Sequence, residues 1–115
     1  SDAITNNPDY KSFSDLNTFG KEEQLAIYEV SDMTPELIWD YGEKIPVIVV
    51  KEVTTLPSEE QFGVVVSEKK LEAFEDLFSD FDITFLARYD INLRGSDARR
   101  HKSRLKRDLF LVTKR

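Results

Sequence analysis

Residues 45–53 read IPVIVVKEV, a nearly unbroken run of β-branched side chains. A strand that is apolar on both faces is covered on both faces, either within a sheet or by an oligomer partner. Pro46 fits such a strand only near its start, because proline has no N–H to donate to the sheet. The run therefore predicts a central strand over 45–53. A polar connection and a second apolar strand, FGVVVS over 62–67, follow it.

The stretch 35–41 has the signals of a short helix. Thr34 is a good N-cap, Pro35 suits the first helical position, and Gly42 can end the helix. The apolar side chains of this stretch form an inner stripe, with Trp39 off to the side.

A second helix is expected to start at Ser67 and to run through 68–81. Its apolar stripe consists of Leu71, Phe74, Leu77, Phe78 and Phe81. Its other side is acidic and carries Glu72, Glu75, Asp76 and Asp80. Such a face is either the solvated side of an amphipathic helix or a surface that recognises a basic partner.

Further strands are expected over 24–30, 83–91 and 107–115, where apolar residues alternate between two faces. Strands and helices interleave along 115 residues, a length that fits one domain with its own core. We therefore expect a single α+β domain with an antiparallel or mixed sheet of about five strands. Two main helices pack on this sheet.

The first 20 residues read as a polar lead-in to a domain that spans 21–115. They either form a short helix whose Tyr10, Phe13 and Leu16 dock on the domain, or a partly ordered tail. The beginning of the chain lacks the basic and apolar regions of a signal peptide. No apolar run approaches the roughly 18 residues that a membrane helix needs. We therefore expect a cytoplasmic protein that makes no contact with a membrane.

Charge is distributed unevenly along the chain. Residues 1–87 hold 6 Lys and Arg against 19 Asp and Glu, whereas residues 88–115 hold 10 against 3. The net charge of the whole chain is -6. This asymmetry indicates either a basic contact surface on an acidic body, or two parts that attract each other within the fold.

Most of the positive charge gathers between residues 94 and 107, in a segment that has little apolar surface to bury. Its candidate binding residues are Arg94, Arg99, Arg100, His101, Lys102, Arg104, Lys106 and Arg107. Gly95 and its neighbours favour a turn, so we expect a hairpin loop, with a helix as the alternative; both present the cations to solvent. Arginine's planar fork suits phosphate or carboxylate. We expect this basic arm to stand clear of the folded body.

Catalytic and metal sites find little support in the sequence. Without cysteine, and with His101 as the single histidine, the chain has no thiolate zinc site and no multi-histidine site. Residues 90–101 begin like a calcium loop but have Arg94 at the fifth position and His101 at the twelfth. One histidine without a second base is weak evidence for catalysis, and Glu68 and Lys70 match a nuclease pattern too short to be specific. We expect no enzyme, metal or cofactor.

These observations lead to a functional hypothesis. We expect a small non-catalytic regulator or adaptor that binds a nucleic acid, or a machine that handles nucleic acid, through the basic arm. A protein partner is equally compatible with the arm. The alternative is an inhibitor or immunity-type protein whose acidic helix face blocks a basic enzyme. The sequence fixes neither the partner nor the oligomeric state.

Overall fold

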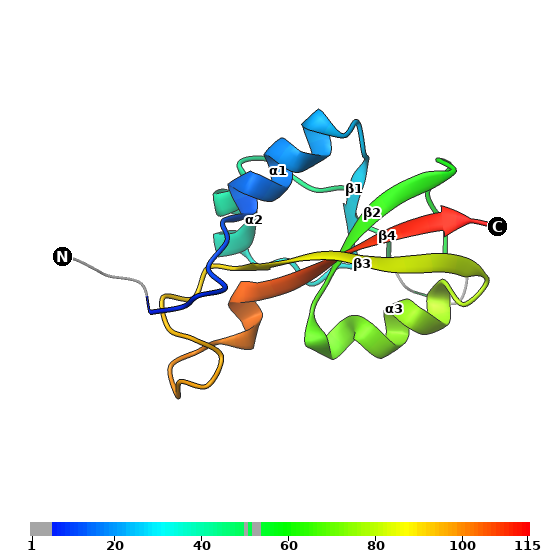
Figure 1. Cartoon of the computed structure of the whole chain (residues 1–115). Helices are drawn as coiled ribbons and strands as arrows, with labels where there is room; N and C mark the ends of the chain where they lie inside the picture. The colour runs from blue at the N-terminus through cyan, green and yellow to red at the C-terminus, as the bar shows by residue number, and fades with distance from the viewer. Residues whose placement is uncertain (1–5, 50, 52–53) are drawn as a thin grey trace.

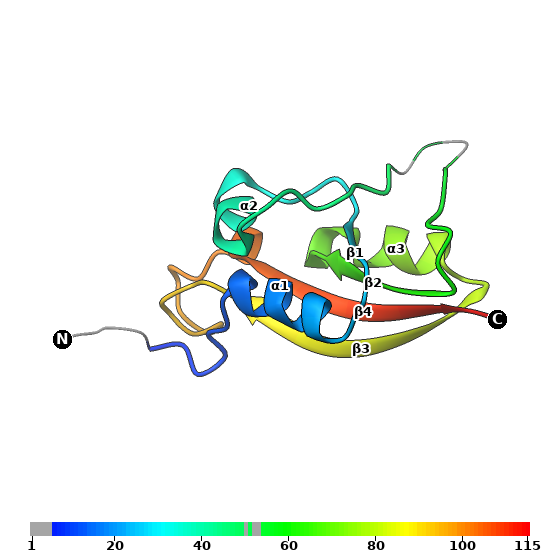
Figure 2. The ribbon, with the colours of Figure 1, turned by 90° about the horizontal axis from the view of Figure 1, so that it is seen from above.

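The computed structural model describes residues 6–49, 51 and 54–115. They form an α+β domain with a four-stranded mixed sheet in the order β1-β2-β4-β3. Figures 1 and 2 show helices α1 and α2 on one face of the sheet and α3 on the other. The class agrees with the sequence prediction, but the sheet has four strands rather than about five, and three α-helices rather than two pack on it. Among the described residues, no helix is long and apolar enough to cross a membrane.

The elements are short and follow one another closely. The helices are α1 (Phe13–Glu22), α2 (Pro35–Tyr41) and α3 (Leu71–Leu77), with the 3-10 turns η1 (Glu68–Lys70) and η2 (Ser103–Leu105). The strands are β1 (Ile27–Glu29), β2 (Gln61–Val66), β3 (Phe81–Asp90) and β4 (Lys106–Lys114). Strands β1 and β2 are parallel, and the two remaining pairs are antiparallel.

Strand β2 occupies the covered position that the sequence indicated for residues 45–53. Its residues from Phe62 to Val66 are all buried, because α1 and α2 cover one face and α3 covers the other. Gly63 lies close to Ile27 and Leu109, and a Cβ placed there would come within 2.8 Å of the Ile27 side chain. A larger residue here would displace the end of the Ile27 side chain, so the packing of β1 against β2 favours glycine at this position.

The predicted central strand over 45–53 is wrong. Among the described residues of this segment, 45–49 and 51, one parallel bridge joins Val47 to Glu29 of β1, and no regular strand forms. Ile45 and Ile48 are buried while Val47 is exposed, so the burial does not follow the alternation of a regular strand. Pro46 also removes one donor from any continuous ladder. Residues 50, 52 and 53 of the predicted strand lie outside the described residues.

The predicted helix over 35–41 is confirmed, with its start at Pro35 and its end at Gly42. Gly42 has a φ of 104°, a left-handed conformation that glycine adopts without strain. The helix predicted over 68–81 is shorter. It begins as the 3-10 turn η1, its α-helical part ends at Leu77, and Phe81 is already the first residue of β3.

Helix α1 belongs to the body of the fold. Phe13 and Leu16 are fully buried in the same core cluster as residues of α2, β2 and β4. The Asp40 carboxylate of α2 accepts hydrogen bonds from the Phe13 N–H at 2.7 Å and the Ser12 hydroxyl at 2.9 Å, so it ties the start of α1 to α2. The division expected between 1–20 and 21–115 therefore falls inside a core helix.

Candidate functional site

The connection between β3 and β4 carries most of the basic arm. It leaves the sheet at Ile91 and returns through η2, and it projects at one end of the molecule (Figure 1). Its backbone bonds run from the Ala98 N–H to the Gly95 carbonyl and from the His101 N–H to the Ala98 carbonyl. These are turn contacts, so the connection is an irregular loop at the end of a hairpin and not a helix.

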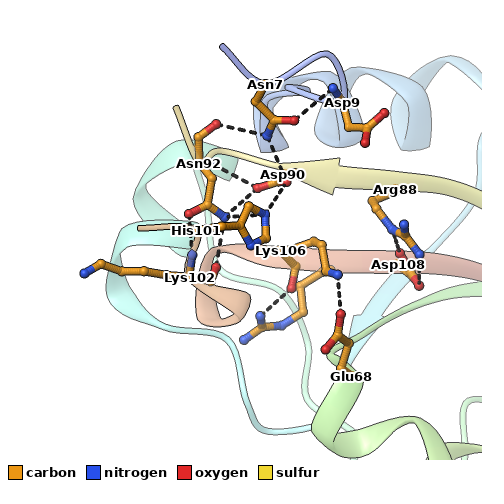
Figure 3. Close-up of polar contacts among 11 residues, drawn as sticks. Asn7, Asp9, Glu68, Arg88, Asp90, Asn92, His101, Lys102, Lys106 and Asp108 are labelled. Atoms are coloured by element: carbon orange, nitrogen blue, oxygen red, sulfur yellow. Dashed lines mark hydrogen bonds and ion pairs between the residues drawn. The ribbon is translucent and has the colours of Figure 1, made fainter. Parts of the chain in front are cut away.

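Asp90, the last residue of β3, anchors this loop (Figure 3). Its carboxylate contacts the His101 ring nitrogen Nε2 at 2.9 Å and accepts hydrogen bonds from the Asn92 amide at 2.7 Å and from the Asn7 amide at 2.9 Å. Asn92 also closes a pair of bonds with the Lys102 backbone. The network therefore joins the N-terminal segment and both ends of the loop.

Burial alone would raise the pKa of Asp90, because it disfavours the charged carboxylate. Hydrogen bonds from His101, Asn92 and Asn7 favour the charged form and outweigh it, so the net pKa lies below the ordinary value. The His101 side chain is only 8% exposed in this arrangement. His101 is thus a structural contact of the loop and does not present a free imidazole to a ligand.

Three further cations of the predicted site, Arg104, Lys106 and Arg107, contact the body. Arg104 forms an ion pair with Glu36 of α2, and Lys106 forms one with Glu68 of η1 (Figure 3). The bond from Lys106 lowers the pKa of Glu68. These pairs hold η2 and the start of β4 against the helices on both faces of the sheet.

Arg107 is buried at 3% exposure. Its guanidinium donates to the backbone carbonyls of Arg104, Lys106 and Asp32, and its Nε lies 3.7 Å from an Asp32 carboxylate oxygen. Burial lowers the pKa of Arg107, and the Asp32 and Glu29 carboxylates oppose this effect. The guanidinium thus ties β4 to the segment before α2.

The expectation that the whole basic arm stands clear of the body is therefore wrong for four of its residues, His101, Arg104, Lys106 and Arg107. The physical reason is that the acidic body supplies carboxylates within reach, and cations close to the sheet pair with them. Arg94, Arg99, Arg100 and Lys102 are exposed as expected, whereas Arg104 is exposed but paired with Glu36. None of the side chains of Arg94, Arg99, Arg100 and Lys102 forms an ion pair with a residue that the structure describes.

Three of the exposed cations meet at a shallow depression of about 660 Å³. Arg94, Arg100 and Lys102 line it together with the apolar side chains of Ile91 and Leu105. Both apolar side chains are partly buried against the core cluster that contains α1 and α2. The depression therefore combines positive charge with apolar surface. It suits a ligand that carries anionic groups next to an apolar or planar surface.

The acidic residues of α3 and of the turn that follows it lie on the opposite side of the sheet from α1 and α2. Glu72, Glu75, Asp76 and Asp80 are all exposed, and none of them pairs with a cation in the described part of the chain. Phe74 and Phe78 lie between α3 and the sheet. The carboxylates thus form a separate surface that does not contribute to the depression.

The residues that build the site were only partly accessible to sequence reasoning. The exposed cations were predicted, but the anchoring roles of Asn7, Asp90 and Asn92 were not. The Asp90-Ile-Asn92 spacing was a usable signal, since Asp and Asn side chains bond to nearby backbone in turns. Within the described residues, no three His, Asp or Glu side chains gather as a metal site would require.

Comparisons with protein-family models, with curated proteins and with solved structures found no match to this chain.

Proposed function

We propose that the protein is a small non-catalytic binding module, a regulator or adaptor that holds a nucleic acid through the exposed cations of the β3–β4 loop. The observation that carries the proposal is the convergence of Arg94, Arg100 and Lys102 on one depression without ion pairs among the described residues. Arg99 extends the same surface. A cytosolic location fits a chain without cysteine.

Electrostatics supports an anionic ligand at this loop. Like charges that lie close together repel one another, and bound phosphates would relieve this repulsion. Arginine can donate two parallel bonds to one phosphate, and three of the four exposed cations are arginines. The apolar surface of the depression offers a base a contact away from water. The acidic body repels the rest of the polyanion, so contact is expected to be confined to the loop.

The number of free cations sets the expected salt dependence. If each of the four meets one phosphate of duplex DNA, log K falls against log salt concentration with a slope of about -3.6. An arm of eight exposed cations would give a slope of about -7. Fluorescence anisotropy with a short fluorescein-labelled duplex, and with a single-stranded RNA of the same length, measures this slope.

A matched pair of variants tests the location. Replacing Arg94, Arg99, Arg100 and Lys102 with alanine should abolish binding and leave the melting temperature nearly unchanged, because none of these side chains is buried. The control replaces the exposed lysines Lys21, Lys44, Lys51 and Lys69, which changes the net charge equally at other places. Equal loss of binding in both variants would show a general charge effect and refute a site on the loop.

The acidic face of α3 supports a second candidate function, inhibition of a basic enzyme. It rests on four exposed carboxylates without ion pairs among the described residues. Charge reversal at Glu72, Glu75 and Asp76 separates the two functions. Loss of binding to a basic protein in this variant, with nucleic-acid binding absent in the native protein, would favour inhibition.

A further inference from the structure

A pocket of about 350 Å³ lies at the edge of the sheet where the two parallel strands end. Strands β1 and β2 run in the same direction, so the segments that leave them, 30–34 and 67–70, meet at this edge. Residues of both segments line the pocket, and η2 and the start of β4 complete the lining. Ligands of sheets with parallel strands commonly bind outside the carboxyl ends of those strands. The pocket therefore lies where segments from several elements converge on one ligand.

Ser67, the residue after β2, supplies a buried hydroxyl to this pocket. It is only 9% exposed and lines the pocket. Its hydroxyl bonds to no residue that the structure describes and does not cap the turn η1 that follows it. A buried hydroxyl without a partner is unfavourable, and a ligand that accepts its hydrogen bond relieves this cost. The Ser103 hydroxyl of η2 lines the same pocket and likewise has no partner in the described part of the chain.

Most of the charged side chains around the pocket already have partners. The pairs are Arg107 with Asp32, Arg104 with Glu36, and Lys106 with Glu68, the last of which is drawn in Figure 3. Glu29 also acts on Arg107, but it does not line the pocket. Lys69 and Lys70 line the pocket and form no ion pair with any residue that the structure describes. After the pairs are counted, the positive charges of these two lysines therefore remain.

A phosphate monoester matches this combination of charge and hydrogen-bond donors. It carries a charge of about -1.5 to -2 at neutral pH and three oxygens that accept hydrogen bonds. The ammonium groups of two lysines balance this charge, and two serine hydroxyls donate to the oxygens. A phosphodiester of a nucleic-acid backbone carries a single charge and matches the site less well. The volume is near the lower limit of about 300 Å³ for ligand pockets, so the site suits a small molecule.

We propose that this pocket binds the phosphate monoester group of a small molecule. Ser67 and Ser103 donate hydrogen bonds to the phosphate oxygens, and Lys69 and Lys70 balance the charge of the phosphate. The pocket shares no lining residue with the depression on the β3–β4 loop. The site is therefore independent of nucleic-acid binding by the loop and adds a second ligand to the molecule.

A nuclear magnetic resonance titration of the whole protein tests the site, with methyl phosphate as the probe. We expect saturable shifts of the backbone amide signals of 67–70 and of Ser103, because these residues surround the phosphate. Dimethyl phosphate, a diester with one charge, should bind about tenfold more weakly, because it leaves one lysine unbalanced and has one charged oxygen fewer. Glycerol phosphate, a monoester with a larger polar group, should bind at least as tightly as methyl phosphate.

Substitutions in the pocket locate the probe. Ser67→Ala should raise the Kd of methyl phosphate about tenfold, the loss expected for one hydrogen bond to a charged group. Its melting temperature should not fall, because the hydroxyl has no partner among the described residues to lose. Lys69→Gln combined with Lys70→Gln should raise the Kd by at least the same factor. The matched control, Lys44→Gln combined with Lys51→Gln, removes two exposed lysines elsewhere and should bind like the native protein.

Two further comparisons separate this site from the loop and from the end of a nucleic acid. The variant with alanine at Arg94, Arg99, Arg100 and Lys102 should bind methyl phosphate like the native protein. An RNA with a terminal phosphate is compared with the same RNA ending in a hydroxyl. The proposal is refuted if neither small monoester shifts the pocket amides, whether or not the phosphorylated RNA does. It is also refuted if dimethyl phosphate binds as tightly as methyl phosphate, or if the two double lysine variants lose binding equally.

Discussion

Arg107 shows that the sequence can predict the charge of a residue but not its burial or its partners. A run of cations between residues 94 and 107 indicated positive charge at one place, and this holds for Arg94, Arg99, Arg100 and Lys102. The sequence did not indicate that Arg107 would be buried against backbone carbonyls, because burial depends on which segment folds over it. Side-chain chemistry is local, whereas the pairing of a charge is decided by residues far away along the chain.

The Asp90 network leads to a prediction about stability. Asp90→Ala leaves the buried Asn7 and Asn92 amides without their acceptor and should lower the free energy of unfolding by about 3 kcal/mol at neutral pH. Urea denaturation followed by circular dichroism measures this loss. The control is Asp97→Ala in the same loop, an exposed position where a change of no more than about 0.5 kcal/mol is expected.

The stability difference between the native protein and Asp90→Ala should depend on pH. Because the folded pKa of Asp90 is lowered, its contribution is fully present above the unfolded pKa of about 3.9 and is lost as pH falls through the folded value. The stability difference between native protein and Asp90→Ala should therefore shrink as the pH falls through the folded pKa of Asp90. A difference that stays constant down to the lowest pH that permits folding would show that the charge of Asp90 is not its source.

At the scale of elements, the sequence was most informative where local chemistry decides the structure. The start and end of α2 were predicted from Pro35 and Gly42, because these residues act on the backbone next to them. Thr34 occupies the N-cap position as predicted, but its hydroxyl makes no capping hydrogen bond. The segment 45–53 was misassigned, because apolar composition does not distinguish an edge from the centre of a sheet. That choice depends on the parallel pairing of β1 with β2, which is set by distant contacts.

Helix α1 allows a test of whether the start of the chain is part of the core. Phe13 is fully buried and packs its ring against Tyr89 at a centroid distance of 5.9 Å. Phe13→Ala should therefore lower the free energy of unfolding by about 3–5 kcal/mol, measured by urea denaturation. Tyr10→Ala, three residues earlier and 43% exposed, should cost less than about 1 kcal/mol. Similar small effects of both substitutions would mean that α1 does not contribute to the core.

At the scale of the whole molecule, two core clusters on opposite faces of the sheet share strands β2 and β4. Val65 and Leu109 belong to the cluster under α1 and α2, whereas Val64 and Val112 belong to the cluster under α3. Removal of the helices from either face of the sheet would thus expose β2 and β4. The loop between β3 and β4 lies at one end, held by its own polar network (Figure 3). This arrangement separates the covered strands of the sheet from the loop on which we propose binding.

Hydrogen exchange should reveal this separation. The bonded amides of β2 and β4 should exchange only through global unfolding, with the same urea dependence as the protein as a whole, because both strands have neighbours on each side. The amides of 94–100 should exchange at free energies near zero, because most of these residues are exposed. Exchange of the loop amides with the urea dependence of β2 would instead show that the loop opens only with the sheet. Nucleic acid should protect the amides of the loop and leave those of β2 unchanged, because the exposed cations proposed to contact it lie on the loop.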